Sequence, residues 1–286
     1  MPFKSFELKL PRTQVGSVLF ASPHSGREMP ADFLDQTILS ETQIRSSEDA
    51  FVDDLYDAAP QLGAPLLHAL APRAFVDLNR APDELDPALI EGLRRQSPNP
   101  RVASGLGVIP RVVANGRHIY SGKITLESAY GRIQNYWRPY HDRLRALIDV
   151  TRQQFGEAIL IDCHSMPHEA LDAMMIGHGE RPDIVLGDRF GASSDGAISD
   201  RVAAAFKRQG FRVSRNIPFA GAYIAQNYGR PSIGQHVVQI EINRALYMDE
   251  ARLEKSAGFE GVRERLVGAM CDIIDIGRAQ MPLAAE

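Results

Sequence analysis

Two histidines follow short apolar runs that are typical of buried strands. His24 comes after Val18–Ala21, and His164 comes after Ala158–Ile161. In open α/β sheets, ligands bind beyond the carboxyl ends of the strands. A single histidine at such a place is more often a turn cap or a hydrogen-bonded core residue, but two at equivalent strand ends favour a pair of metal ligands. Asp162 stands two residues before His164 on the same face of the strand, where it would orient the ring or face the same crevice.

The remaining ligand of such a metal must be a carboxylate. The chain has two cysteines, Cys163 and Cys271, which excludes a disulfide framework and a multi-cysteine zinc cluster. A catalytic zinc ion is commonly held by two histidines and one carboxylate, with one position open to water. Glu28, Glu48 and Asp49 are the candidates. Asp49 precedes an apparent helix, so the competing interpretation is that it caps that helix.

Asn79 and Arg80 would form a site for a carboxylate. They follow the β-rich run Arg73–Leu78, which predicts a strand that ends at the same edge of the sheet. Arginine binds carboxylates in a bidentate manner, and an asparagine amide adds a further donor. The predicted role is to hold a free carboxylate of an acidic substrate. The alternative is a surface ion pair between Arg80 and Asp83 or Glu84.

Glu241 lies within the apolar run Val237–Ile242. A buried carboxylate is costly unless it is paired or functional. A general base beside a metal site would account for that cost, and a buried ion pair with Arg244 is the alternative. Weaker candidates for substrate contacts, each as readily structural, are Arg138, His141 and Arg230.

Strands that alternate with helices must position these residues. The predicted strands are Val18–Ala21, Arg73–Leu78, Ala158–Ile161, Asp183–Leu186 and Val237–Ile242. The predicted helices are Tyr130–Val150 with a kink or junction at Pro139, Ser199–Gln209, and a last helix with Val262, Leu266, Met270 and Ile273 on one side. Long surface loops are expected at Ala81–Gln96 and Ser97–Gly116. This pattern predicts a single α/β domain over residues 1–286, a three-layer sandwich with a mostly parallel or mixed sheet.

Composition excludes several classes of protein. The 286 residues carry a net charge of −4, which argues against a dedicated nucleic-acid binder. A bilayer span needs about 20 apolar residues, and no such run occurs, nor does the start of the chain have the apolar core of a signal peptide. We therefore expect a cytoplasmic enzyme that binds neither nucleic acid nor membrane, and the sequence leaves the oligomeric state open.

Six segments, in order along the chain, resemble the N-formylglutamate amidohydrolase family. They are Pro23–Gly26, Asp77–Arg80, Trp137–His141, Asp162–Ser165, Asp183–Asp188 and Glu241–Met248. The resemblance implies hydrolysis of N-formyl-L-glutamate to L-glutamate and formate, a step of histidine degradation. It also implies a fold similar to that of the zinc-dependent carboxypeptidases and aspartoacylases, which is a zinc-exopeptidase-like (phosphorylase/hydrolase-like) α/β fold.

The resemblance assigns a role to each main candidate. His24 and His164 match metal ligands, with zinc as the expected ion. Asn79 and Arg80 match the pair with which carboxypeptidases hold the substrate α-carboxylate, and Glu241 matches their catalytic glutamate.

The third ligand departs from the carboxypeptidase pattern. Those enzymes place a glutamate three residues after the first histidine ligand, where this chain has Arg27, and Glu28 comes one residue later. Asp49 matches an aspartate of the formylglutamate family and is the preferred ligand, with Glu48 and Glu28 as alternatives.

Two other functions are compatible with the same residues. One is an N-acyl amino acid hydrolase or carboxypeptidase-like enzyme with a different substrate. The other is a non-catalytic protein that binds acidic metabolites, which would leave both histidines and the strand glutamate without a role.

Overall fold

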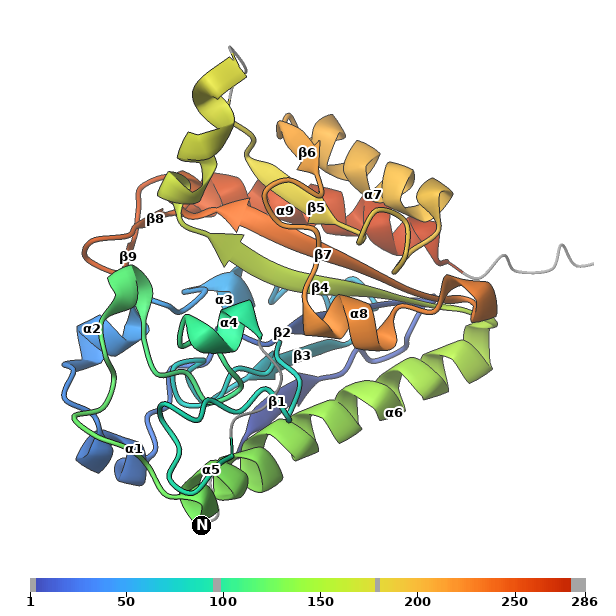
Figure 1. Ribbon diagram of the computed structural model, residues 1–286. Coiled ribbons are helices and arrows are strands. Elements are labelled where there is room, and N and C mark those ends of the chain that lie inside the picture. The colour runs from blue at the N-terminus through green and yellow to red at the C-terminus, as the bar shows by residue number, and fades with distance from the viewer. Residues whose placement is uncertain (1–3, 95–98, 178–180, 279–286) are drawn as a thin grey trace, which may run out of the picture.

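A seven-stranded mixed sheet forms the centre of the computed structural model, which describes residues 4–94, 99–177 and 181–278 (Figure 1). The strands lie in the order β1-β3-β2-β4-β7-β5-β6. Their bounds are β1 Phe6–Lys9, β2 Val18–Ser22, β3 Leu66–Ala69, β4 Ala158–Met166, β5 Ile184–Gly187, β6 Val213–Arg215 and β7 Gln235–Asn243. Strands β3, β2, β4 and β7 are parallel neighbours, whereas β1 and β5 run antiparallel to them. The carboxyl ends of four central strands therefore meet at one edge.

Helices cover both faces of this sheet and complete the three-layer α/β sandwich expected from the sequence. Helix α6 (Arg138–Phe155) lies on one face, and α7 (Gly196–Arg208) and α9 (Phe259–Ile276) lie on the other (Figure 1). Side chains of β2 alternate between the two cores: Leu19 packs in the core of α6, and Phe20 in that of α7 and α9. Because both faces are covered, β2 is buried at every position.

The long helices follow their apolar stripes. Helix α9 buries Val262, Leu266, Met270 and Ile273, which confirms the predicted amphipathic helix. The stretch predicted as one helix consists of α5 (Leu126–Arg132), a π-helical segment (Ile133–Trp137) and α6. Pro139 lies in the first turn of α6, where a missing backbone N–H is tolerated, so the predicted junction is confirmed.

The strand predicted at Arg73–Leu78 is wrong. The Pro72 carbonyl accepts from the N–H of Phe75 at 2.9 Å and of Val76 at 3.4 Å, so the chain turns there instead of extending. The run is apolar because it packs into the core beside α6. The strand in this part of the sheet is the earlier β3, which the sequence analysis did not predict.

The two segments predicted as long surface loops are partly buried where they are described. Leu85, Leu89, Val108 and Ile109 belong to the core beside α6. The short helix α4 (Pro100–Ala103) lies between them, and residues 95–98 fall outside the described residues. These segments therefore form one wall of the molecule around the sheet edge.

Short elements complete the fold. The helices are α1 Ala31–Gln36, α2 Glu41–Arg45, α3 Val52–Leu55 and α8 Tyr223–Tyr228; the 3₁₀ segments are Ala114–Gly116, His168–Gly177, Pro231–Ile233 and Arg244–Leu246; and β8 Met248–Asp249 pairs with β9 Glu254–Lys255. In the described part of the chain, no helix is both long enough and apolar enough to cross a bilayer.

Candidate metal centre and substrate pocket

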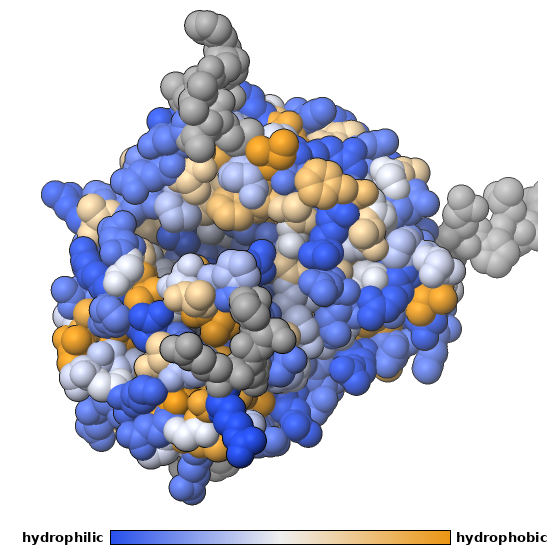
Figure 2. All heavy atoms as spheres, in the orientation of Figure 1, coloured by the Kyte–Doolittle hydropathy of each residue, from blue (hydrophilic) through white to orange (hydrophobic). Residues whose placement is uncertain are grey.

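A cavity of about 690 Å³ opens at the carboxyl ends of the central strands. In the space-filling view, this face of the molecule is hollowed between its upper and lower halves (Figure 2). The lining includes most of the residues that the sequence singled out: His24, Asp49, Asn79, Arg80, His164 and Glu241. His24, His164 and Glu241 come from the ends of the predicted strands, whereas Asp49, Asn79 and Arg80 lie in segments between strands.

The backbone positions of both histidines are set by the sheet. His24 lies in the tight turn after β2, where a Cβ on Gly26 would come within 2.2 Å of the Ala71 carbonyl oxygen. The turn therefore lies directly against the chain that leaves β3. His164 lies within β4, and the parallel register places it opposite Glu241 of β7.

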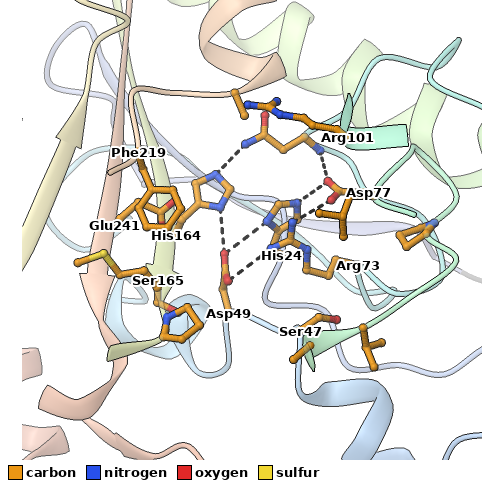
Figure 3. A pocket seen from close by; sticks show the side chains of 18 of the residues that line it. His24, Ser47, Asp49, Arg73, Asp77, Arg101, His164, Ser165, Phe219 and Glu241 are labelled. Atoms are coloured by element: carbon orange, nitrogen blue, oxygen red, sulfur yellow. Dashed lines mark hydrogen bonds and ion pairs between the residues drawn. The ribbon is translucent and has the colours of Figure 1, made fainter. Parts of the chain in front are cut away.

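Asp49 lies between the two histidines (Figure 3). Its Oδ2 lies 2.9 Å from Nδ1 of His164 and 3.4 Å from Nδ1 of His24. One potential ligand atom from each of the three residues falls within 4.8 Å of the others, and all three side chains are buried. This is the His₂-carboxylate set expected for a catalytic metal site.

Outer partners hold the other side of each ring. Nε2 of His24 lies 2.7 Å from Oδ1 of Asp77. Nε2 of His164 lies 3.2 Å from Nδ2 of Asn79 and 3.1 Å from Oδ1 of Asp162. Such carboxylate partners commonly fix the tautomer of a metal-binding histidine. Asp162 stands where the strand alternation predicted, whereas the role of Asp77 was missed, although its place in a buried apolar run was a signal.

The donor set fits a divalent metal. In the part of the chain that the structure describes, Nδ1 of His24 and Oδ2 of Asp162 are buried without a hydrogen-bond partner, and Oδ1 of Asp162 has only its ion-pair contact with His164. If both Nδ1 atoms bound a metal, both Nε2 atoms would carry protons, directed toward Asp77 and Asp162. Metal binding would thereby satisfy polar atoms that the protein alone leaves unpaired.

The electrostatics of the cluster favour its charged forms. Burial opposes ionisation of Asp49, yet the adjacent rings of His164 and His24 hold its pKa well below the ordinary value. Burial also opposes a charge on His164, but Asp162 and Asp49 raise its pKa well above the usual range. The pair is thus an anion against a cation, and a metal ion would replace the proton of His164 as the positive charge.

The structure distinguishes the three candidate carboxylates. Glu48 is turned toward Arg45, whose Nε lies 2.7 Å from its Oε2, and Glu28 is exposed. Asp49 does not cap a helix, since α3 has Phe51 at its N-cap in a left-handed conformation with φ of 64°. Its backbone N–H donates instead to the His24 carbonyl at 3.0 Å, which ties the two ligand segments together.

Glu241 points into the same pocket (Figure 3). Burial raises its pKa to about 7, with Asp49 adding to the effect and His164 opposing it. Gln239 donates to its Oε1 at 2.9 Å. Arg244 pairs with Asp49 at 2.8 Å, so the alternative of a Glu241–Arg244 ion pair is not what this arginine forms.

Arg80 and Asn79 both line the pocket, but their side chains are engaged differently. Arg80 donates to the carbonyls of Leu106 and Asn79 at 3.0 and 3.3 Å. No ion pair joins it to Asp83 or Glu84. The Asn79 amide accepts from the Ile224 N–H at 2.7 Å and faces His164, so it connects α8 to the metal cluster.

The three weaker candidates lie outside the pocket lining. Arg138 and Arg230 are exposed. His141 is buried, with its nitrogens 2.8 Å from the Leu78 carbonyl and 2.9 Å from the Tyr228 hydroxyl, and burial lowers its pKa to about 3. Three arginines that the sequence analysis did not propose for substrate binding line the pocket instead: Arg73, Arg101 and Arg244.

Known proteins are similar to this chain over most of its length. A model of the N-formylglutamate amidohydrolase family matches residues 16–248. The N-formylglutamate deformylases of Pseudomonas putida and Pseudomonas aeruginosa are 30% and 31% identical to this chain, each over 82% of both proteins.

Solved structures show the same relationship. The crystal structure of an N-formylglutamate amidohydrolase from Ralstonia eutropha JMP134 is 34% identical and covers 96% of this chain and 98% of its own, with a TM-score of 0.89. A gene product of Agrobacterium tumefaciens shares the fold at 17% identity and a TM-score of 0.63. The extent of these matches shows that the chain belongs to the N-formylglutamate amidohydrolase family.

Proposed function

We propose that this protein hydrolyses N-formyl-L-glutamate to L-glutamate and formate. The observation that carries the proposal is the convergence of His24, Asp49 and His164 beside Glu241, in a chain of this family. In the reaction, water oxygen bonds to the formyl carbon, the C–N bond breaks, and the amine nitrogen takes a proton.

His24, Asp49 and His164 would hold a divalent metal, for which we propose zinc. Such an ion supplies Lewis acidity, which makes water more acidic and polarises a carbonyl. The carboxylates of Asp77 and Asp162 lie beside the two Nε2 atoms, so the rings are oriented before any ion binds.

Glu241 is the general base in this proposal. Its buried carboxylate, held at Oε1 by Gln239, would accept a proton from water and deliver it to the leaving amine. A carboxyl pKa of about 7 suits both transfers at neutral pH. Arg80 would hold one substrate carboxylate. The assignment to histidine degradation and to the cytoplasm stays a prediction from the family resemblance.

A substrate panel tests the proposal. The purified protein, supplied with zinc, is assayed on N-formyl, N-acetyl and N-succinyl derivatives of glutamate and of neutral amino acids. We expect the highest kcat/KM for N-formyl-L-glutamate. Preference for an N-acetyl or N-succinyl substrate would assign the protein to the alternative N-acyl amino acid hydrolases, and binding without turnover would assign it to the non-catalytic binders.

Glu241→Gln tests the base separately. We expect this variant to keep its metal and to lose about 10²- to 10⁴-fold in kcat. The matched control is Glu260→Gln, which removes a carboxylate from an exposed position on α9. Turnover by Glu241→Gln at the wild-type rate would contradict the assignment.

A further inference from the structure

The four arginines of the pocket differ in how their charges are balanced. Arg73 lies 2.9 Å from Asp77, and Arg244 lies 2.8 Å from Asp49. Over residues 4–94, 99–177 and 181–278, neither of the other two arginines forms an ion pair with a carboxylate. Two positive charges of the pocket are therefore left for an anion from outside the protein.

Of these two, Arg80 donates hydrogen bonds to two backbone carbonyls, whereas the Arg101 side chain forms none with the described residues. Asn99 caps α4: its Oδ1 accepts from the backbone N–H of Arg101 at 3.0 Å and of Val102 at 3.3 Å. The guanidinium itself has no hydrogen-bond or ion-pair partner in the part of the chain that the structure describes. The capped helix α4 thus presents this exposed guanidinium to the cavity.

Arg80 and Arg101 face the same region of the cavity. Burial lowers the pKa of the Arg80 guanidinium, and repulsion by Arg101 contributes to the lowering. Asp77 and Glu84 attract the Arg80 guanidinium but form no ion pair with it, so a bound anion would offset repulsion that remains. One carboxylate on each guanidinium would remove the repulsion.

The pocket also has apolar lining residues, which include Met166, Pro167, Pro218 and Phe219. Figure 3 shows Phe219 and Glu241 on one side of the pocket and Arg101 on the other. A substrate with its scissile amide at Glu241 would therefore place its anionic groups on the side of Arg101.

We propose, on the basis of the proposed function, that Arg101 binds the side-chain carboxylate of the substrate while Arg80 binds its α-carboxylate. Arg101 is then the residue that selects acidic amino acids. With a neutral side chain, the Arg101 guanidinium gains no partner, and its repulsion of Arg80 persists.

Paired substrates test this role. N-formyl-L-glutamate and N-formyl-L-glutamine have nearly the same shape but differ in side-chain charge. We expect Arg101→Gln to lower kcat/KM for N-formyl-L-glutamate by about 10- to 100-fold, mainly through KM, and to change kcat/KM for N-formyl-L-glutamine less than about 3-fold. Arg101→Lys should keep part of the preference, because it keeps the charge but not the planar fork.

The control is Arg143→Gln, which removes an exposed arginine on α6 and should leave both rates unchanged. An equal loss on both substrates, or no loss on either, would overturn the role of Arg101. Failure of the proposed function looks different, because the wild-type protein would then not hydrolyse N-formyl-L-glutamate at all.

Discussion

Two clusters of histidine and carboxylate, one buried and one partly exposed, share the turn that follows β2. We call one the metal cluster, which consists of His24, Asp49 and His164. The other lines a second cavity of about 250 Å³, and we call it the paired cluster. It consists of Glu7, Arg27, Asp53 and His68.

Each charge of the paired cluster has its own partner. Nε2 of His68 lies 3.0 Å from Glu7, and Arg27 lies 2.9 Å from Asp53. Nδ1 of His68 is 4.0 Å from Asp53, but the adjacent arginine already supplies the positive charge there. A metal ion would have to displace that arginine or bear its repulsion.

The metal cluster is organised around one shared carboxylate. Both histidines turn Nδ1 toward the same oxygen of Asp49, while Arg244 takes the other oxygen. The same residue types thus give an ion-pair network in one place and a candidate metal site in the other. Convergence on one point, and not composition, distinguishes them.

The largest effect is expected at the shared carboxylate. Asp49→Asn removes one ligand charge and leaves Arg244 buried without its partner. We expect kcat/KM for N-formyl-L-glutamate to fall about 10³-fold or more, since several kcal/mol of transition-state stabilisation are lost. Asp53→Asn, the equivalent change in the paired cluster, should leave kcat/KM within about 3-fold. Equal losses in the two variants would remove the distinction between the clusters.

A smaller effect is expected at the carboxylates that contact the outer nitrogens of the histidines, Asp77 at His24 and Glu7 at His68. Asp77→Asn frees the His24 ring, and we expect metal affinity to fall about 10- to 100-fold in a competition titration with a chelator. Glu7→Gln makes the same type of change at His68 and should leave metal affinity unchanged. If Asp77→Asn binds metal as tightly as the wild type, Asp77 does not orient the ligand.

Gly26 connects the two clusters and tests the packing of their common turn. A methyl group there would meet the Ala71 backbone, and we expect Gly26→Ala to lower the free energy of unfolding in urea by about 1–3 kcal/mol. Gly131 in α5 has open space around it, so Gly131→Ala should be neutral or stabilise by up to about 1 kcal/mol. A destabilisation of the same size at both sites would contradict the close packing of the turn.

His141 lies in neither cluster, and its burial predicts a pH dependence of the protein's stability. His141 has a pKa of about 3 in the folded protein, against about 6.5 when unfolded. Below pH 6.5 the unfolded chain binds the extra proton, so the contribution of His141 to stability is complete above that pH. It is lost by up to about 1.4 kcal/mol per pH unit as the pH falls toward 3.

Unfolding in urea at pH 7 and pH 5 measures this contribution. The wild-type protein should lose more stability between these two values than His141→Gln does. An identical pH dependence in the two proteins would contradict a neutral, buried His141.

The sequence predicted the parts of this protein that depend on local pattern. Strands β2, β4 and β7 are long enough and apolar enough to be recognised, and the polar residues at their ends led to His24, His164 and Glu241. The choice of Asp49 came from the family resemblance. Spacing alone does not distinguish it from Glu48, because the two are neighbours; the contacts differ, since Glu48 pairs with Arg45 and the Asp49 N–H donates to the His24 carbonyl.

The parts that depend on tertiary contacts were not predicted. Asp77 reaches His24 because the chain turns at Pro72, and that turn was taken for a strand. Arg138 lies in a polar-aromatic segment but outside the pocket lining, whereas Arg101, in a segment predicted as a surface loop, lines the pocket; both side chains are exposed. Strand β3 was missed although β5, which is equally short and equally buried, was predicted; the run of β3 is interrupted by the polar His68.

Metal analysis of matched histidine variants tests the central claim most directly. The wild-type protein, His164→Ala and His68→Ala are each loaded with zinc, dialysed, and analysed for bound metal by mass spectrometry. We expect about one zinc ion per chain in the wild type and in His68→Ala, and none in His164→Ala. Equal zinc in all three proteins, or a loss confined to His68→Ala, would contradict the assignment of the metal to His24, Asp49 and His164.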